Sequence, residues 1–186
     1  MTPDKLEKLY EIDKKTEFFR IIFLTSRQKE FWGKIGHDSR KVHEKTKLVT
    51  DYLIDRFAIQ DVLTRYAAAV DDRDLDMYRD CFAENAEILG FGNDSVIGAD
   101  AWTEEVKNKL EAFGATQHLL GPQIINIEGD LAFTRTDVQA LHYIKDRPRE
   151  TLTLWAVYLT NYRRIKDEWK IIRHELVRRG TRTQKD

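Results

Sequence analysis

The hydrophobic periodicity of this chain changes once along its length, and that change limits the folds it can adopt. From residue 59 to residue 70 the apolar positions recur every three or four residues, at Ile59, Val62, Leu63, Tyr66, Ala67 and Val70. This spacing is typical of an amphipathic helix. After Gly114 the apolar positions alternate instead, which favours strands with one buried face. We therefore expect helices first and a sheet afterwards.

Turn-forming residues divide the two halves into elements. In order, we expect helices over 53–70 and 75–82, a short strand over 87–91, a helix over 101–113, and strands over 124–127, 131–144, 151–165 and 169–178. Aspartates of the segment 71–74 can cap the second helix, and Gly114 is the expected stop of the third. Three helices followed by hairpin-linked strands predict an α+β fold, with the helices packed on one face of a curved antiparallel sheet.

Composition excludes several classes of protein. The 186-residue chain suits one domain and has a net charge of −1, so it lacks the basic field of a nucleic-acid-binding protein. No apolar run approaches the ~20 residues that cross a bilayer, so no membrane association is expected. Cys81 is the only cysteine, which favours a reducing compartment, and we expect a cytoplasmic protein. No zinc-ligand spacing or phosphate-binding glycine motif occurs, so neither metal nor cofactor is expected.

The charge balance reverses near residue 49. Residues 1–48 carry a net charge of +4 and residues 49–186 one of −5. The first segment also holds Phe18, Phe19, Phe23, Phe31 and Trp32, without a sustained helical or alternating period. We expect residues 1–48 to be an extension and 49–186 to be the domain. The extension is either disordered, a helical arm that docks on a partner, or the product of a start codon placed upstream of a true start at Val49.

Four short motifs, in this order, resemble the SnoaL-like family. They are Ile59-x-x-Val62-Leu63-x-x-Tyr66-Ala67-x-x-Val70-Asp71, Phe82-Ala83, Thr116-Gln117-His118 and Gly129-Asp130-x-Ala132, and the closing Trp169-Lys170-Ile171-Ile172 also fits. The resemblance covers about residues 50–180. It implies the cone-shaped α+β barrel typified by nuclear transport factor two, in which the helices and the sheet enclose a pocket.

The resemblance also implies candidate catalytic residues. Lyase-type members of this group, such as scytalone dehydratase, bile-acid dehydratase and hexachlorocyclohexane dehydrochlorinase, share an aspartate and a histidine at positions matched by Asp71 and His118. The bile-acid dehydratase pattern adds a tyrosine and an arginine, matched by Tyr66 and Arg178. A further tyrosine of the dehydratases has no match, because residues 89–92 read Leu-Gly-Phe-Gly.

An aspartate bonded to a histidine can perform proton-transfer chemistry. The carboxylate fixes the tautomer of the imidazole and stabilises the imidazolium that forms on proton abstraction, and Arg178 or Tyr66 could hold an oxyanion of the substrate. Each residue also has a structural interpretation. Asp71 can cap the second helix, His118 can be a hydrogen-bonded histidine at a strand start, Tyr66 can belong to the core, and Arg178 can be solvated. Nothing is assigned to His142 or His174.

These patterns lead to one leading hypothesis and one rival. The leading hypothesis is a cofactor-independent lyase or isomerase for a small hydrophobic substrate, such as a polycyclic one. The rival is a non-catalytic subunit that binds a small molecule or has a structural role. Trp155, Val157 and Leu159 lie on one side of a long strand, so we also expect a homodimer or a higher homo-oligomer.

Overall fold

A computed structural model describes residues 39–92, 94–147 and 149–185, with side chains from residue 44 onward. Its contacts divide the chain into two units, residues 1–50 and 51–186. The expected extension lies outside the described residues as far as residue 38, and residues 39–48 are helical. The second unit contains the sheet, two whole helices and most of a third.

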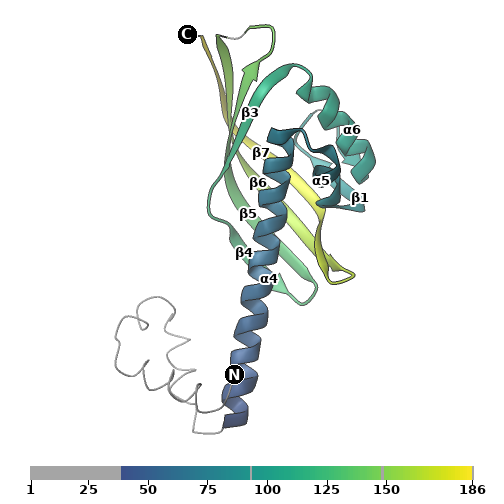
Figure 1. Ribbon diagram of the computed structural model, residues 1–186, viewed down its shortest axis with the longest axis vertical. Helices are drawn as coiled ribbons and strands as arrows, with labels where there is room; N and C mark the ends of the chain where they lie inside the picture. The colour runs from purple at the N-terminus through teal and green to yellow at the C-terminus, as the bar shows by residue number, and fades with distance from the viewer. Residues whose placement is uncertain (1–38, 93, 148, 186) are drawn as a thin grey trace, which may run out of the picture. The chain divides into compact units, whose positions relative to one another are not determined.

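In the described part of the chain, three helices precede or interrupt the first strands (Figure 1). Helix α4 spans Ser39–Asp72, α5 spans Leu75–Asp80 and α6 spans Ala99–Leu110. The stripe predicted for the first helix is buried from Ile59 to Val70. Arg73 breaks the helix with a positive φ of 63°, and the Asp74 carboxylate caps α5 by accepting a hydrogen bond from Met77 N at 2.9 Å.

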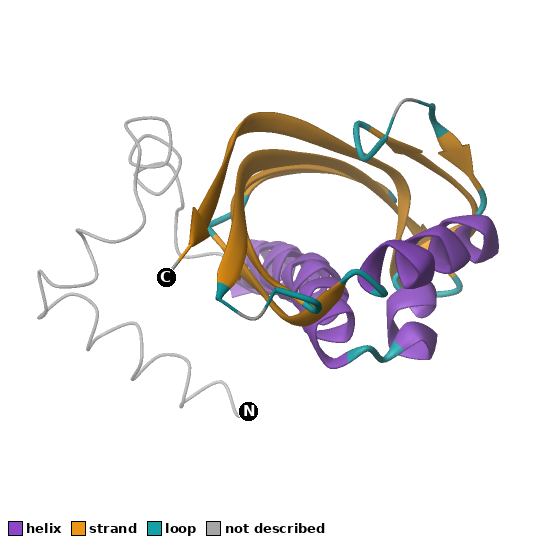
Figure 2. Ribbon diagram, turned by 90° about the horizontal axis from the view of Figure 1, so that it is seen from above, coloured by secondary structure: helices purple, strands orange, loops and turns teal. Residues whose placement is uncertain are grey.

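Seven strands form one curved sheet. They are β1 (Phe82–Leu89), β2 (Val96–Ile97), β3 (Phe113–Leu120), β4 (Ile124–Glu128), β5 (Leu131–Ile144), β6 (Glu150–Ile165) and β7 (Glu168–Lys185). Their order is β2-β1-β7-β6-β5-β3, and β4 also pairs with β5. Figure 2 shows the sheet curling so that the helices lie on its open side. The predicted α+β class is confirmed.

The sheet differs from the prediction in its pairing, because β1 runs parallel to β7 and the sheet is therefore mixed. Strand β1 also begins at Phe82, which the helical pattern had placed in the second helix. Phe82 is buried and lies opposite Ile171 of β7, so pairing with a distant strand outweighs the local periodicity. Gly114 is not a helix stop but lies within β3, and the two-residue strand β2 was not predicted.

The core lies between the helices and the inner face of the sheet. Alternate residues of β5, β6 and β7 point inward, and the buried set includes both apolar residues and the polar Thr134, Thr136, Thr160 and His174. Because a strand alternates its side chains, this face is also where functional side chains can approach the helices. No helix among the described residues is long and apolar enough to cross a membrane.

Candidate active site

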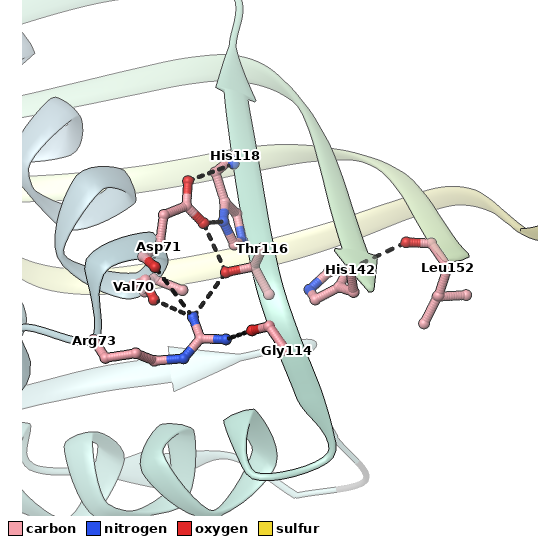
Figure 3. Close-up of polar contacts among 8 residues, drawn as sticks. All are labelled: Val70, Asp71, Arg73, Gly114, Thr116, His118, His142 and Leu152. Carbon is pink, nitrogen blue, oxygen red and sulfur yellow. Dashed lines mark hydrogen bonds and ion pairs between the residues drawn. The ribbon is translucent and has the colours of Figure 1, made fainter. Parts of the chain in front are cut away.

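Asp71 and His118, 47 positions apart, meet at the end of α4. Asp71 Oδ1 lies 2.8 Å from His118 Nδ1, and Asp71 Oδ2 accepts a hydrogen bond of 2.7 Å from the backbone N–H of His118 (Figure 3). One carboxylate therefore holds both the ring and the backbone of the same residue. The alternative in which Asp71 caps α5 is wrong, since Asp74 provides that cap.

The contact determines which nitrogen of His118 is basic. An ionised carboxylate can only accept, so Nδ1 carries the hydrogen and the lone pair is on Nε2. No hydrogen bond from another described residue reaches Nε2, and the side chain of His118 is 9% exposed. Partial burial of Asp71 would raise its pKa, but the hydrogen bonds and charge of His118, together with the Thr116 hydroxyl, outweigh this and lower the pKa. The carboxylate is therefore ionised at neutral pH.

Thr116 and Arg73 fix the carboxylate from the other side. Thr116 Oγ1 donates to Asp71 Oδ1 at 2.9 Å and accepts from Arg73 Nη1 at 2.8 Å. Arg73 also donates to the carbonyl oxygens of Val70 and Gly114 (Figure 3). The guanidinium thus joins the end of α4 to the start of β3, which sets the distance between Asp71 and His118.

His142 lies beside His118, although nothing was assigned to it from the sequence. The two imidazoles are 5.7 Å apart, edge to face, and His142 Nδ1 lies 3.4 Å from the carbonyl oxygen of Leu152. Burial, and secondly the nearby His118, lower the pKa of His142, so it is neutral at neutral pH. The signal in the sequence is the alternation along β5, because His142 shares the parity of Val138 and Ala140, but it places His142 on the inner face only once those two residues are known to be buried.

Tyr66 does not join the pair in the structure. It is buried among the rings of Tyr78, Phe82, Tyr158 and His174, and its pKa is raised well above the ordinary value, first by burial and then by Tyr78. Its environment matches the core interpretation, and any role in catalysis stays a prediction.

Arg178 is exposed and is not in contact with Asp71 or His118. It lies opposite Ala156 on the inner face of the sheet, at the same parity as the buried His174 and Leu176. Among the described residues no hydrogen bond or ion pair holds its guanidinium. Its role in binding a substrate stays a prediction.

The described residues contain no cluster of three or more histidine, cysteine, aspartate or glutamate side chains that could hold a metal ion. The inner face near the pair also carries apolar residues. Leu154 lies next to Ala140 and Leu152 next to His142 in the register of β5 and β6, and both leucines are only half-buried. The arrangement is thus a basic nitrogen with both polar and apolar neighbours on the inner face.

The chain is thus a small α+β protein with an aspartate–histidine pair at the end of its first domain helix. Its residues 51–175 match the model of the SnoaL-like domain, so the chain belongs to the SnoaL-like family. No curated protein matches the chain.

Several solved structures are similar to this chain. A candidate scytalone dehydratase from Novosphingobium aromaticivorans DSM 12444 has a TM-score of 0.67 and 22% identity over 72% of this chain and 90% of its own. Hexachlorocyclohexane dehydrochlorinase LinA-type3 from Novosphingobium barchaimii LL02 has a TM-score of 0.65 and 21% identity over 73% of this chain and 93% of its own. A candidate aromatic ring hydroxylase from Novosphingobium aromaticivorans DSM has a TM-score of 0.64 and 29% identity over 72% and 94%. The first two likenesses show the fold alone.

Proposed function

We propose that the protein is a cofactor-independent lyase or isomerase that removes a proton from a small hydrophobic substrate. The observation that carries the proposal is the 2.8 Å contact between Asp71 Oδ1 and His118 Nδ1, which leaves Nε2 as the basic atom. His118 is the base and Asp71 its orienting partner.

In the proposed reaction, His118 Nε2 takes a proton from a carbon next to an electron-withdrawing group. Asp71 stabilises the imidazolium that forms, as a carboxylate does in other histidine-based enzymes. The electron pair left on carbon then forms a double bond. If a neighbouring carbon carries a hydroxyl group, the imidazolium protonates it, water leaves and the neutral imidazole is restored. If the leaving group is a halide, the proton passes to solvent; in an isomerisation it returns to a different carbon.

The surroundings support a hydrophobic substrate. Leu120, Leu152 and Leu154 share the inner face with the pair and are half-buried, so a ligand there would exchange water for apolar contacts. The neutral His142 beside His118 adds a second group able to hydrogen-bond a polar atom of the ligand.

The rival function is a non-catalytic subunit that binds a small molecule on the same face. The similar structures include a candidate dehydratase, a dehydrochlorinase and a candidate ring hydroxylase, so the fold does not decide the reaction. Among the described residues His118 Nε2 has no hydrogen-bond partner, and this favours the enzyme, since a purely structural histidine normally has both nitrogens bonded.

Deuterium exchange tests the proposal without knowledge of the natural substrate. The full chain would be incubated in D2O with a panel of cyclic ketones and β-hydroxy ketones. NMR would follow two reactions of each compound: the loss of its C–H signals by exchange for deuterium, and its conversion to the alkene by elimination of water. We expect Asp71→Asn and His118→Gln to slow the catalysed exchange by about 10²–10⁴-fold. The matched control is Asp137→Asn, because Asp137 is exposed and its side chain pairs with no described residue except Arg135.

Two results would contradict the proposal. Retention of the wild-type rate by either variant would exclude the pair as the site of proton transfer. Binding of panel members by calorimetry, without exchange or elimination in any of them, would favour the non-catalytic subunit.

A further inference from the structure

His174 is a fully buried imidazole on β7 with one unpartnered nitrogen. The residue is 0% exposed, its Nδ1 lies 2.9 Å from Thr160 Oγ1, and its Nε2 has no hydrogen-bond partner in the described part of the chain. Burying a polar atom without a partner costs free energy, and native proteins rarely do so. An apolar ring would avoid that cost, so packing alone does not require an imidazole at this position.

A second unpartnered polar atom lies on the same inner face. Thr136 Oγ1, on β5, is buried and also lacks a partner among the described residues. Tyr158 of β6 is paired with Thr136 in the register, and its ring centroid lies 4.6 Å from that of His174. Unsatisfied polar atoms therefore occur on both sides of Tyr158.

Tyr158 connects this region to the Asp71–His118 pair. Burial raises the pKa of Tyr158 well above its ordinary value, Tyr66 raises it further, and the charge of Asp71 also contributes. The Asp71 carboxylate is therefore within electrostatic range of the Tyr158 hydroxyl. His174 contacts the ring of the same tyrosine.

Phe91 covers the face of His174. The two rings are stacked at 5.4 Å with an interplanar angle of 26°, and Phe91 is half-buried, whereas Tyr66 and Tyr158 beside the same imidazole are buried. Phe91 lies in the short connection between β1 and β2, directly after Gly90. Phe91 is thus the most exposed of the three rings, so a rotation of its side chain would uncover one face of the imidazole.

The imidazole is suited to an uncharged oxygen. Burial lowers its pKa to about 3, so it is neutral at neutral pH and can donate one hydrogen bond and accept another. With Nδ1 at Thr160, Nε2 donates to a carbonyl oxygen in one tautomer and accepts from a hydroxyl group in the other. A carboxylate beside a neutral, fully buried ring would have no compensating charge.

We propose that His174 Nε2 hydrogen-bonds a carbonyl or hydroxyl oxygen of the ligand on which the Asp71–His118 pair acts. This inference rests on the proposed function and narrows its substrate class to oxygenated hydrophobic molecules. A halogenated hydrocarbon without oxygen would leave Nε2 unsatisfied.

Histidine ring nitrogens, observed by long-range ¹H–¹⁵N NMR on the ¹⁵N-histidine-labelled full chain, test this directly. The probes are indane, 1-indanone and 1-indanol, which share one ring skeleton and differ only in the oxygen. The signals that disappear from the spectrum of the His174→Phe variant are assigned to His174. If that variant does not fold, they are those of the imidazole that stays neutral down to about pH 4 in the wild type, because its pKa is about 3.

We expect 1-indanone or 1-indanol, but not indane, to shift the Nε2 signal of His174. With 1-indanone the Nε2 signal should shift as that of a nitrogen that donates a hydrogen bond, and with 1-indanol as that of a nitrogen that accepts one. The direction of the shift therefore identifies the preferred oxygen. His174→Phe should bind the preferred probe about tenfold more weakly and indane equally well. Perturbation of His118 by all three probes, without any at His174, would overturn this inference alone. If no probe perturbs any histidine up to its solubility limit, both this inference and the binding that the proposed function requires are overturned.

Discussion

The contact between Asp71 and His118 depends on residues that do not touch the imidazole. Thr116 donates one of the three hydrogen bonds that the carboxylate accepts, and Arg73 holds the Thr116 hydroxyl in the orientation that allows this. A threonine whose hydroxyl is already bonded to a guanidinium has little freedom to point elsewhere. Thr116 and Arg73 therefore fix the orientation of the Asp71 carboxylate and also stabilise its negative charge.

Thr116→Val tests that support at the scale of one residue. The change keeps the shape of the side chain but removes a hydrogen bond that lowers the pKa of Asp71. We expect the catalysed exchange to fall by about tenfold at neutral pH, and its acid limb to move to higher pH because the carboxylate protonates more readily. The pH–rate profile is the measurement. Thr103→Val is the control, since its hydroxyl bonds only the Ala99 carbonyl of its own helix. An unchanged acid limb would show that Thr116 does not tune Asp71.

The sequence could indicate the pair but not its support. Asp71 and His118 were proposed because a family pattern links them, and the contact is present. Arg73 was missed because its role depends on a positive φ and on carbonyl oxygens of two elements, neither of which has a sequence pattern. His142 was left unassigned because strand parity identifies a face only after the buried face is known.

At the scale of elements, one ion pair ties α4 to the hairpin of β6 and β7. Arg164 donates to both oxygens of Asp55 at 2.7 and 2.8 Å, and its guanidinium lies 4.5 Å from the centre of the Trp169 ring. Trp169 Nε1 also donates to Asp55. These contacts join residues 109 and 114 positions apart, so they form only when the helix is seated on the sheet.

Asp55→Ala should destabilise the domain by about 2 kcal/mol at neutral pH, because it leaves a part-buried guanidinium without its bidentate partner. The pKa of Asp55 is lowered in the folded state, mainly by the hydrogen bond from Arg164 against the opposing effect of burial. Its contribution is therefore complete above the unfolded pKa near 3.8 and is lost as the pH falls through the folded value. The free energy of unfolding, measured with urea at pH 7 and near pH 3, should differ less between Asp55→Ala and the wild type at the lower pH. Asp137→Ala, which breaks an exposed pair, should cost less than about 0.5 kcal/mol. Equal costs for the two variants would contradict this account.

The element order could be read from the sequence because helical and alternating periods are local properties. The long strands 131–144 and 151–165 were predicted within one residue of β5 and β6. The parallel pairing of β1 with β7 could not be, since it joins residues about 90 positions apart. Strand β7 extends to Lys185, beyond the predicted end at residue 178, because β6 pairs with it along its whole length.

At the scale of the whole molecule, the outer face of the sheet suggests self-association. Leu131, Phe133 and Trp155 are between 39% and 48% exposed there, whereas Val157, expected in the same patch, is buried. Leu131, Phe133 and Ile172 border a hollow of about 360 Å³ on this face. An isologous dimer would cover these side chains.

Light scattering at micromolar concentration measures this directly, and we expect twice the chain mass. Phe133→Asp should shift the mass to that of the monomer without loss of fold, because Phe133 packs on the surface and not in the core. Asp137→Asn is again the control on the same strand. A monomeric wild type would contradict the expectation.

Residues 49–186 should fold without residues 1–48. The family match begins at residue 51, and the contacts separate a second unit from residue 51 onward. Helix α4 starts at Ser39, so the cut removes its first ten residues, but the buried stripe of that helix begins only at Ile59. The cut therefore removes helical backbone without removing any side chain known to be buried.

We expect a soluble domain whose thermal midpoint, followed by circular dichroism, lies within a few degrees of that of the full chain. If residues 1–48 instead form an arm that docks on a partner, the cut would abolish assembly and leave the fold intact. Insolubility, or a midpoint lower by more than those few degrees, would show that residues 1–48 cover part of the domain.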